Sequence, residues 1–143
     1  MATLNQRSIK ERIFHALLFE GLAILLTILI GVYILNKPVA SMGILSVLIS
    51  LTALLLNIVF NAIFDRYFPF VDGQRPVKIR ILQAMGFEGS LILFTIPMIA
   101  FFLQVSLWEA FMIELGFLIF FLFYTYSYNW CYDQLRRYLI QSR

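Results

Sequence analysis

The sequence has little charge and no polar stretch long enough to fold as a soluble domain. Charged residues make up 13% of its 143 residues, whereas 62% are hydrophobic. A soluble domain of this size keeps a large part of its area in water and could not bury so much apolar side chain. The composition therefore excludes an ordinary soluble protein and predicts a membrane protein.

Cysteine is also scarce, because Cys131 is the only one, so an internal disulfide is impossible. We expect Cys131 to be a small packing residue. The sequence contains no nucleophile motif, metal-ligand set or cofactor loop, and we therefore expect no enzyme, no metal site and no cofactor. No basic stripe on a folded soluble domain is present, which argues against a nucleic-acid surface.

Four long apolar runs account for the hydrophobic excess. Each reaches or exceeds the ~20 residues that a helix needs to cross ~30 Å of hydrocarbon. Continuous runs also differ from the ~10-residue alternation of barrel strands. The first run is too long for a signal-peptide core and contains Glu20, so we expect it to be retained. The sequence predicts an all-α membrane protein with four transmembrane helices, at residues 13–35, 39–64, 81–107 and 110–132.

The basic residues gather on one side of these runs. Of the eleven, ten precede the first run, separate the second from the third, or follow the fourth, and only Lys37 lies in an opposite turn. Loops with an excess of Lys and Arg remain in the cytoplasm. We therefore expect both termini and the middle segment to be cytoplasmic.

A shift of 68 residues aligns the two halves of the chain. Arg12-Ile13 falls on Arg80-Ile81, and Phe19-Glu20-Gly21 falls on Phe87-Glu88-Gly89. In the second helix of each half, Asn61 falls on Asn129 and Asp65 on Asp133. We predict two parallel repeats, residues 1–70 and 71–143, each a helical hairpin, related by an axis near the membrane normal. Parallel repeats recur in secondary transporters.

Four charged residues are expected to lie near the cytoplasmic interface. Counting residues away from each hairpin turn, at ~1.5 Å per residue, places Arg12 level with Asp65 and Arg80 level with Asp133. We predict two structural ion pairs, Arg12–Asp65 and Arg80–Asp133, each between the helices of one hairpin. The functional alternative is that the aspartates guard the inner mouth of a pathway.

Glu20 lies deeper, eight residues or ~12 Å beyond Arg12. A carboxyl in lipid is costly, so we expect Glu20 to face a cavity lined by protein. Glu88 occupies the same position in the second repeat, and His15 is a neighbour that can modulate Glu20. Plain packing is an equal alternative for His15, because the second repeat has Gln83 there. We expect Glu114 to be interfacial.

Polar residues also form a stripe on the second helix of each half. Asn57, Asn61 and Asp65 follow i, i+4, i+8 spacing, and Thr125, Asn129 and Asp133 repeat it. For the asparagines, simple hydrogen bonding between helices is an equal alternative. We expect the aromatic residues near the end of the fourth apolar run to form a belt at the membrane interface. The alternative is that some of them stack on a flat or cationic ligand. The candidates for a substrate pathway are Phe19, Asn57, Asn61, Asn129, Trp130 and Tyr132.

Four segments resemble the signatures of one transporter family. They are RIFHALLFEG (12–21), NIVFNAIFD (57–65), RILQAMGFEG (80–89) and YNWCYD (128–133). Together they resemble the proteobacterial antimicrobial compound efflux (PACE) family, whose members consist of two tandem bacterial transmembrane pair domains. Two departures bear on substrate preference: Leu56 replaces a usual Trp, and Gln83 replaces a common His.

The resemblance implies a four-helix exporter of the bacterial inner membrane that is driven by proton entry. Its substrates would be cationic biocides such as chlorhexidine, acriflavine-like dyes and, for some members, short diamines or other polyamines. The essential membrane glutamate of the family falls on Glu20. If a proton and a cation compete for this carboxylate, their movements in opposite directions are coupled.

We expect a homodimer in the lipid bilayer, because four helices barely enclose a site for a large dication. Two other functions remain open from the sequence. One is an accessory or assembly subunit without transport activity, which would need only the polar contacts between helices. The other is a membrane-embedded enzyme that uses His15, Glu20 and the polar stripes.

Overall fold

The computed structural model describes residues 7–142 and consists of four long helices. They are α1 (Ile9–Tyr33), α2 (Val39–Tyr67), α3 (Val77–Leu103) and α4 (Leu107–Gln141). Each is long and apolar enough to cross a membrane, and the described residues contain no β-strand. The predicted all-α membrane fold with four spanning helices is confirmed.

Local chemistry sets the helix ends. The hydroxyls of Ser8 and Ser106 accept hydrogen bonds from the backbone N–H groups of Glu11 and Glu109, at 3.2 and 3.1 Å, and so cap α1 and α4. Pro38 and Pro76 occupy the corresponding positions before α2 and α3. Gln104 ends α3 in the left-handed conformation, with φ of 53°. At the helix starts, the two serines satisfy and the two prolines remove backbone donors that would otherwise be unpaired.

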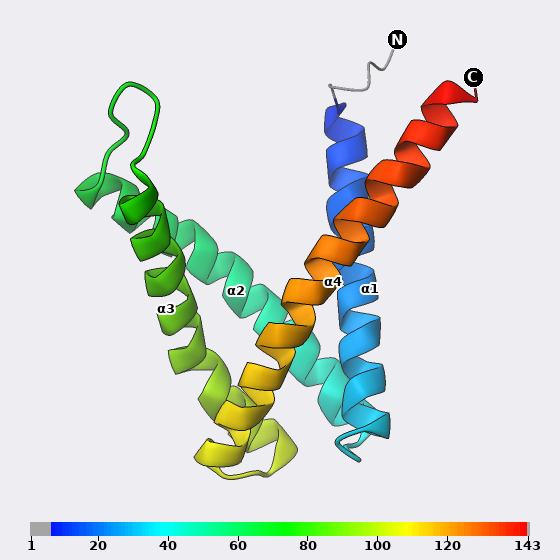
Figure 1. Cartoon of the computed structure of the whole chain (residues 1–143). Helices are drawn as coiled ribbons and strands as arrows, with labels where there is room; N and C mark the ends of the chain where they lie inside the picture. The colour runs from blue at the N-terminus through cyan, green and yellow to red at the C-terminus, as the bar shows by residue number, and fades with distance from the viewer. Residues whose placement is uncertain (1–6, 143) are drawn as a thin grey trace.

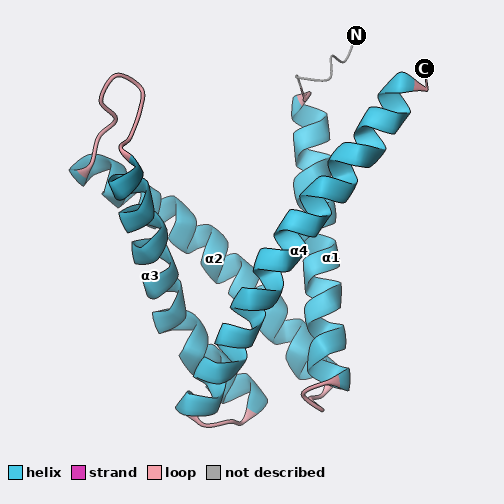
Figure 2. Cartoon of the chain, in the orientation of Figure 1, coloured by secondary structure: helices cyan, strands magenta, loops and turns pink. Residues whose placement is uncertain are grey.

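All connections lie at the two ends of the helices (Figure 2). The short turns at residues 34–38 and 104–106 mark one end, which we call the turn end. The start of α1, the end of α4 and the segment 68–76 lie at the other, the terminal end (Figure 1). In this segment Val71 pairs with Gln74 around Asp72 and Gly73, whose φ angles are 51° and 71°.

The four helices meet at the turn end and separate towards the terminal end (Figure 1). A buried apolar cluster holds them where they meet; it comprises Met42, Leu45, Ile99, Leu103 and Ala110. Beyond it α1 runs beside α4, and α2 runs beside α3 (Figure 1). Each hairpin therefore opens, and its helices change partners across the repeats.

Tyrosine hydroxyls connect α4 to α1. Tyr124 donates a hydrogen bond to the backbone carbonyl of Phe19 at 2.7 Å, and Tyr128 donates one to that of His15 at 2.8 Å. Nearer the terminal end, Arg136 forms an ion pair with Glu11. A hydroxyl inside a membrane span needs such an acceptor, because lipid offers none.

The α2–α3 pair repeats some of these contacts at the offset of 68. The rings of Phe60 and Phe87 lie 5.9 Å apart, and those of their equivalents Tyr128 and Phe19 lie 5.1 Å apart, both edge to face. The Arg75 guanidinium lies 5.3 Å from the Phe64 ring, and the Arg7 guanidinium 5.5 Å from the equivalent Tyr132 ring. The duplication in the sequence thus recurs as duplicated contacts, as a two-fold axis between parallel repeats requires.

Candidate functional site

A cavity of about 550 Å³ lies between the four helices. Its walls come from the stretches 19–27 of α1, 42–57 of α2, 87–103 of α3 and 113–121 of α4. Met42 and Ile99, at the turn end of the lining, are almost completely buried. Glu20 and Asn57, at its other end, are exposed. The cavity is therefore closed towards the turn end and open towards the terminal end.

Three carboxylates line this cavity, Glu20 from α1, Glu88 from α3 and Glu114 from α4. The other polar lining residues are Thr27, Ser46, Ser50 and Asn57, and most of the wall is apolar. An apolar cavity with a few convergent polar groups is the usual form of a small-molecule site. Because carboxylates in an apolar wall need protons or cations as partners, the geometry favours a cationic ligand.

Glu20 is held by α2. The hydroxyl of Ser50 donates a hydrogen bond to the Glu20 carboxyl. A carboxylate can accept about four hydrogen bonds, so one bond from Ser50 fixes its position and leaves most of its acceptor capacity unused.

Glu88 and Glu114 come from the two helices of the second repeat. The hydroxyl of Thr95 and the carboxyl of Glu88 lie near the Glu114 carboxyl. The cavity therefore carries acidic groups from both repeats, on α1 and on the α3–α4 hairpin.

Comparison with known proteins decides the family. The model of the chlorhexidine efflux transporter family (BTP) matches the chain twice, over residues 7–70 and 75–138. The chain belongs to this family. The predicted membership, with two tandem domains, is confirmed, whereas the boundary that we place between residues 70 and 71 stays a prediction.

Three curated relatives of this efflux family member are each named short-chain diamines transporter. The protein of Vibrio parahaemolyticus is 38% identical over 88% of this chain and 90% of its own length. The protein of Acinetobacter baylyi is 36% identical over 90% of this chain and 91% of its own length. The protein of Acinetobacter baumannii is 33% identical over 88% of this chain and 88% of its own length. No solved structure matches the chain. The family and the relatives show that the protein is a transporter.

The transporter's cavity includes only some of the residues that the sequence singled out. Glu20, Glu88, Phe19 and Asn57 line it. His15 does not; its ring packs against those of Tyr128 and Tyr132, at centroid distances of 5.0 and 4.4 Å. The ring nitrogen Nε2 of His15 is buried and has no hydrogen-bond partner among the described residues.

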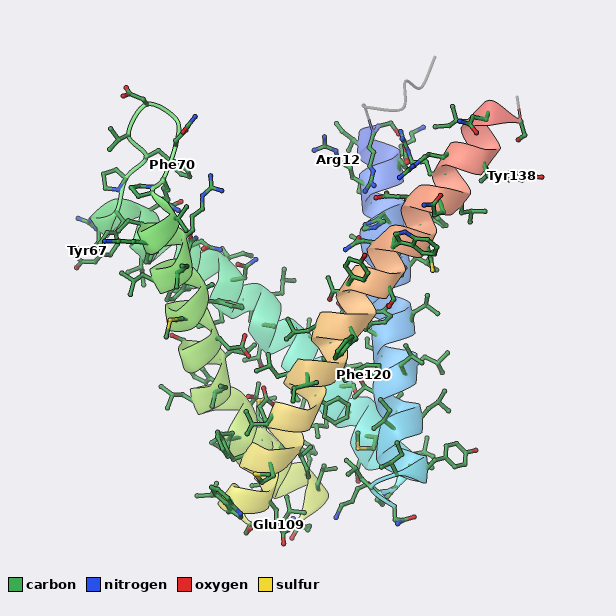
Figure 3. The ribbon with its side chains drawn as sticks, viewed as in Figure 1. Arg12, Tyr67, Phe70, Glu109, Phe120 and Tyr138 are labelled. Carbon is green, nitrogen blue, oxygen red and sulfur yellow. The ribbon has the colours of Figure 1, made fainter. Side chains whose placement is uncertain are left out.

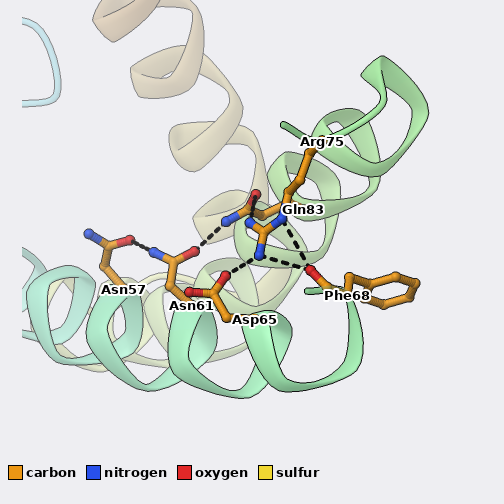
Figure 4. A network of polar contacts seen from close by, with 6 residues as sticks. All are labelled: Asn57, Asn61, Asp65, Phe68, Arg75 and Gln83. Atoms are coloured by element: carbon orange, nitrogen blue, oxygen red, sulfur yellow. Dashed lines mark hydrogen bonds and ion pairs between the residues drawn. The ribbon is translucent and has the colours of Figure 1, made fainter. Parts of the chain in front are cut away.

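The remaining pathway candidates lie towards the terminal end of the transporter. Asn61 donates to Asn57 and accepts a hydrogen bond from the Gln83 amide at 2.6 Å (Figure 4). Arg75 donates to Gln83 at 3.1 Å and forms an ion pair with Asp65 (Figure 4). This network runs from a cavity-lining residue to the segment between the repeats. Asn129, Trp130 and Tyr132 lie outside the cavity lining, in the corresponding part of α4.

The predicted ion pairs are corrected by the structure. Asp65 pairs with Arg75, and Asp133 pairs with Arg7, rather than with Arg12 and Arg80. The reason is that each hairpin opens towards the terminal end, so that Asp65 meets the segment before α3 and Asp133 meets the segment before α1. Arg7 and Arg75 are equivalent at the offset of 68. One ion pair is therefore built twice.

Glu114 is a cavity residue that the sequence interpretation did not assign to the site, because it expected Glu114 to be interfacial. It lines the cavity on the same face of α4 as Phe117 and Phe121. A signal was present, since Glu114 precedes Thr125 by eleven residues, or about three helical turns, and so shares the face of the polar stripe. Ser50 was also missed, because a serine inside a membrane span is common and carries no distinctive pattern.

Proposed function

We propose that this protein is an antiporter that exports short-chain diamines and other organic cations, including cationic biocides such as chlorhexidine and acriflavine-like dyes, in exchange for protons. The observation that supports it best is the cavity, in which Glu20 stands in a largely apolar wall with one hydrogen bond from Ser50. The names of the relatives support diamines as the substrate class.

Competition at Glu20 provides the coupling in this proposal. A carboxylate in an apolar wall is stabilised either by a proton or by a cation. When a proton arrives, the cation loses its partner and leaves, and when a cation arrives, the proton leaves. Exchange of one for the other drives the substrate against the direction of the proton. His15 acts from the α1–α4 contact rather than within the cavity, and Glu88 contributes a weaker second acid.

The membrane orientation gives the direction of transport. With both termini on the cytoplasmic side of the bacterial inner membrane, the opening of the cavity faces the cytoplasm. The structure then corresponds to the state that accepts substrate from inside the cell. The buried cluster at the turn end closes the outer side.

Reconstituted transport tests this function. Purified protein is placed in liposomes with an acidic lumen, and uptake of radiolabelled putrescine is compared with that of protein-free liposomes, which correct for passive trapping of a weak base. We expect uptake that exceeds this control and disappears when a protonophore removes the gradient. Uptake equal to the control would reject transport of diamines, and uptake unaffected by the protonophore would reject proton coupling.

A further inference from the structure

The two repeats differ in the acidity of their cavity walls. At the offset of 68, Glu88 corresponds to Glu20, but Glu114 corresponds to Ser46. The Ser46 hydroxyl donates to the carbonyl of Met42 at 2.6 Å and is satisfied within its own helix. The second repeat therefore has a second carboxylate where the first has a hydroxyl that already has a partner.

The surroundings of Glu114 lack a cation. Among the described residues that line the cavity there is no Lys, Arg or His. The Thr95 side chain, which lies near Glu114, is fully buried, and among the described residues its hydroxyl oxygen has no hydrogen-bond partner within 3.5 Å. A buried polar group without a partner costs free energy, and a pair of carboxyls costs more. The Glu88–Glu114 wall is thus a site that a bound ammonium group would complete.

The wall formed by the first repeat offers a comparable group. Glu20 is fixed by Ser50, on the hairpin formed by α1 and α2. The lining around both groups is mainly aliphatic and aromatic, with Leu91 and Phe117 among its residues. A chain of methylene groups buries its area against such a wall, while its two ends remain near carboxylates.

We propose that Glu114, together with Glu88, forms a second ammonium subsite, so that the cavity binds a linear dication with one amine at Glu20 and the other at Glu114. This inference rests on the proposed function in one respect, that Glu20 accepts a cation. It adds the residue that selects diamines over monoamines. A monoamine pairs with one wall and leaves the other carboxylate unpaired in an apolar cavity, so its binding is weaker.

Binding in detergent tests the inference without any need for transport. Dissociation constants of the purified protein are measured by calorimetry for putrescine and for n-butylamine, which share a four-carbon chain. We expect putrescine to bind at least about tenfold more tightly than n-butylamine, because it forms a second charge pair. Equal affinities for the two ligands, or no binding of putrescine, would overturn the second subsite. If the preference is present but liposomes show no uptake, only the proposed transport function fails.

Variants assign the preference to Glu114. Glu114→Gln keeps the shape of the side chain, and we expect it to reduce putrescine affinity about tenfold while n-butylamine affinity changes less than about threefold. Glu109→Gln is the matched control, because Glu109 precedes Glu114 by five residues on α4, lies at the turn end (Figure 3) and does not line the cavity.

Glu114→Asp keeps the charge and retracts it by one methylene, and we expect the diamine preference to persist with an optimum at a longer diamine such as cadaverine. If Glu114→Gln does not fold, Glu114→Asp still provides a test of the assignment. Equal losses for putrescine and n-butylamine in Glu114→Gln, or complete loss of the preference in Glu114→Asp, would overturn the assignment.

Discussion

Glu20 and Glu88 show how one repeated residue acquires two environments. Both stand in the same FEG motif and line the same cavity. Glu20 receives a hydrogen bond from Ser50, whereas Glu88 lies near a second carboxyl, Glu114. The two glutamates are therefore not interchangeable, although the sequence makes them equivalent.

The first prediction concerns the substitution Glu20→Gln. Glutamine keeps the shape and accepts the Ser50 hydrogen bond, so the variant should insert and melt like the wild type. Gradient-driven putrescine uptake should fall to the level of protein-free liposomes, because an amide neither exchanges protons nor attracts a cation. Glu88→Gln should retain partial uptake. Wild-type uptake in Glu20→Gln, with expression and melting temperature measured alongside, would contradict the mechanism.

The sequence was sufficient to predict Glu20 and Glu88 but not Glu114. The two former residues are marked by a repeated motif, and their depth in the membrane makes a lipid-facing position costly. Glu114 stands close to a hairpin turn, and counting residues along the helix places it near the interface. The count ignores that the helices converge at the turn end, which brings this position into the wall of the cavity. Only the packing of α3 against α4 shows that.

At the scale of the helices, the change of partners is the main finding that the sequence did not predict. Hydropathy defines spans but not which spans pair, because lipid-facing and partner-facing residues are equally apolar. The prediction of Arg12–Asp65 assumed that each hairpin stays closed. The repeat offset contained a better guide. Arg7 and Arg75 are equivalent at the offset of 68, and each pairs with the aspartate in the second helix of the other repeat.

The second prediction tests the Arg75–Asp65 pair. The Arg75 side chain is only 5% exposed and also donates to the carbonyl of Phe68 at 3.0 and 3.2 Å. Asp65→Asn leaves this buried guanidinium without its counter-charge and should cost about 1–3 kcal/mol of stability. The double variant Asp65→Asn/Arg75→Gln should recover part of the loss. Arg12→Gln, at an exposed residue, is the control, and melting temperatures in detergent provide the measurement. A double variant whose loss of stability equals the sum of the losses in Asp65→Asn and Arg75→Gln would show that the pair is not coupled.

The third prediction concerns the close contact of α1 with α2 at the turn end. A Cβ atom at Gly31 would overlap the side chain of Met42, which is 1% exposed. Gly31→Ala should therefore destabilise the fold by about 1–3 kcal/mol, the usual cost of overpacking. Gly21→Ala is the control, since nothing lies within 4 Å of its Cβ position. Met42→Ala should restore space in the double variant. Equal melting temperatures for Gly31→Ala and Gly21→Ala would argue against this packing.

For the whole molecule, the fourth prediction is a homodimer. The pairs α1–α4 and α2–α3 separate towards the terminal end (Figure 1), and a second copy would complete the enclosure of a large cation. We expect a crosslinked dimer when a homobifunctional reagent is added to native membranes, and a twofold mass by light scattering in detergent after the detergent mass is subtracted. Active transport by a species that crosslinks only as a monomer would reject the dimer.

The last prediction fixes the orientation of the molecule and, with it, the direction of transport. The start of α1, the end of α4 and the segment 68–76 lie at one end of the structure (Figure 1). The cavity opens towards the same end. Ten of the eleven basic residues of the sequence lie before the first span, between the second and third, or after the fourth. Because such residues are retained in the cytoplasm, a fluorescent protein fused after Arg143 should be bright and alkaline phosphatase fused there should be inactive. Phosphatase fused in the turn at residues 104–106 should be active. The opposite pattern would turn the open end of the cavity outward, and the structure would then represent the state that releases substrate rather than the state that accepts it.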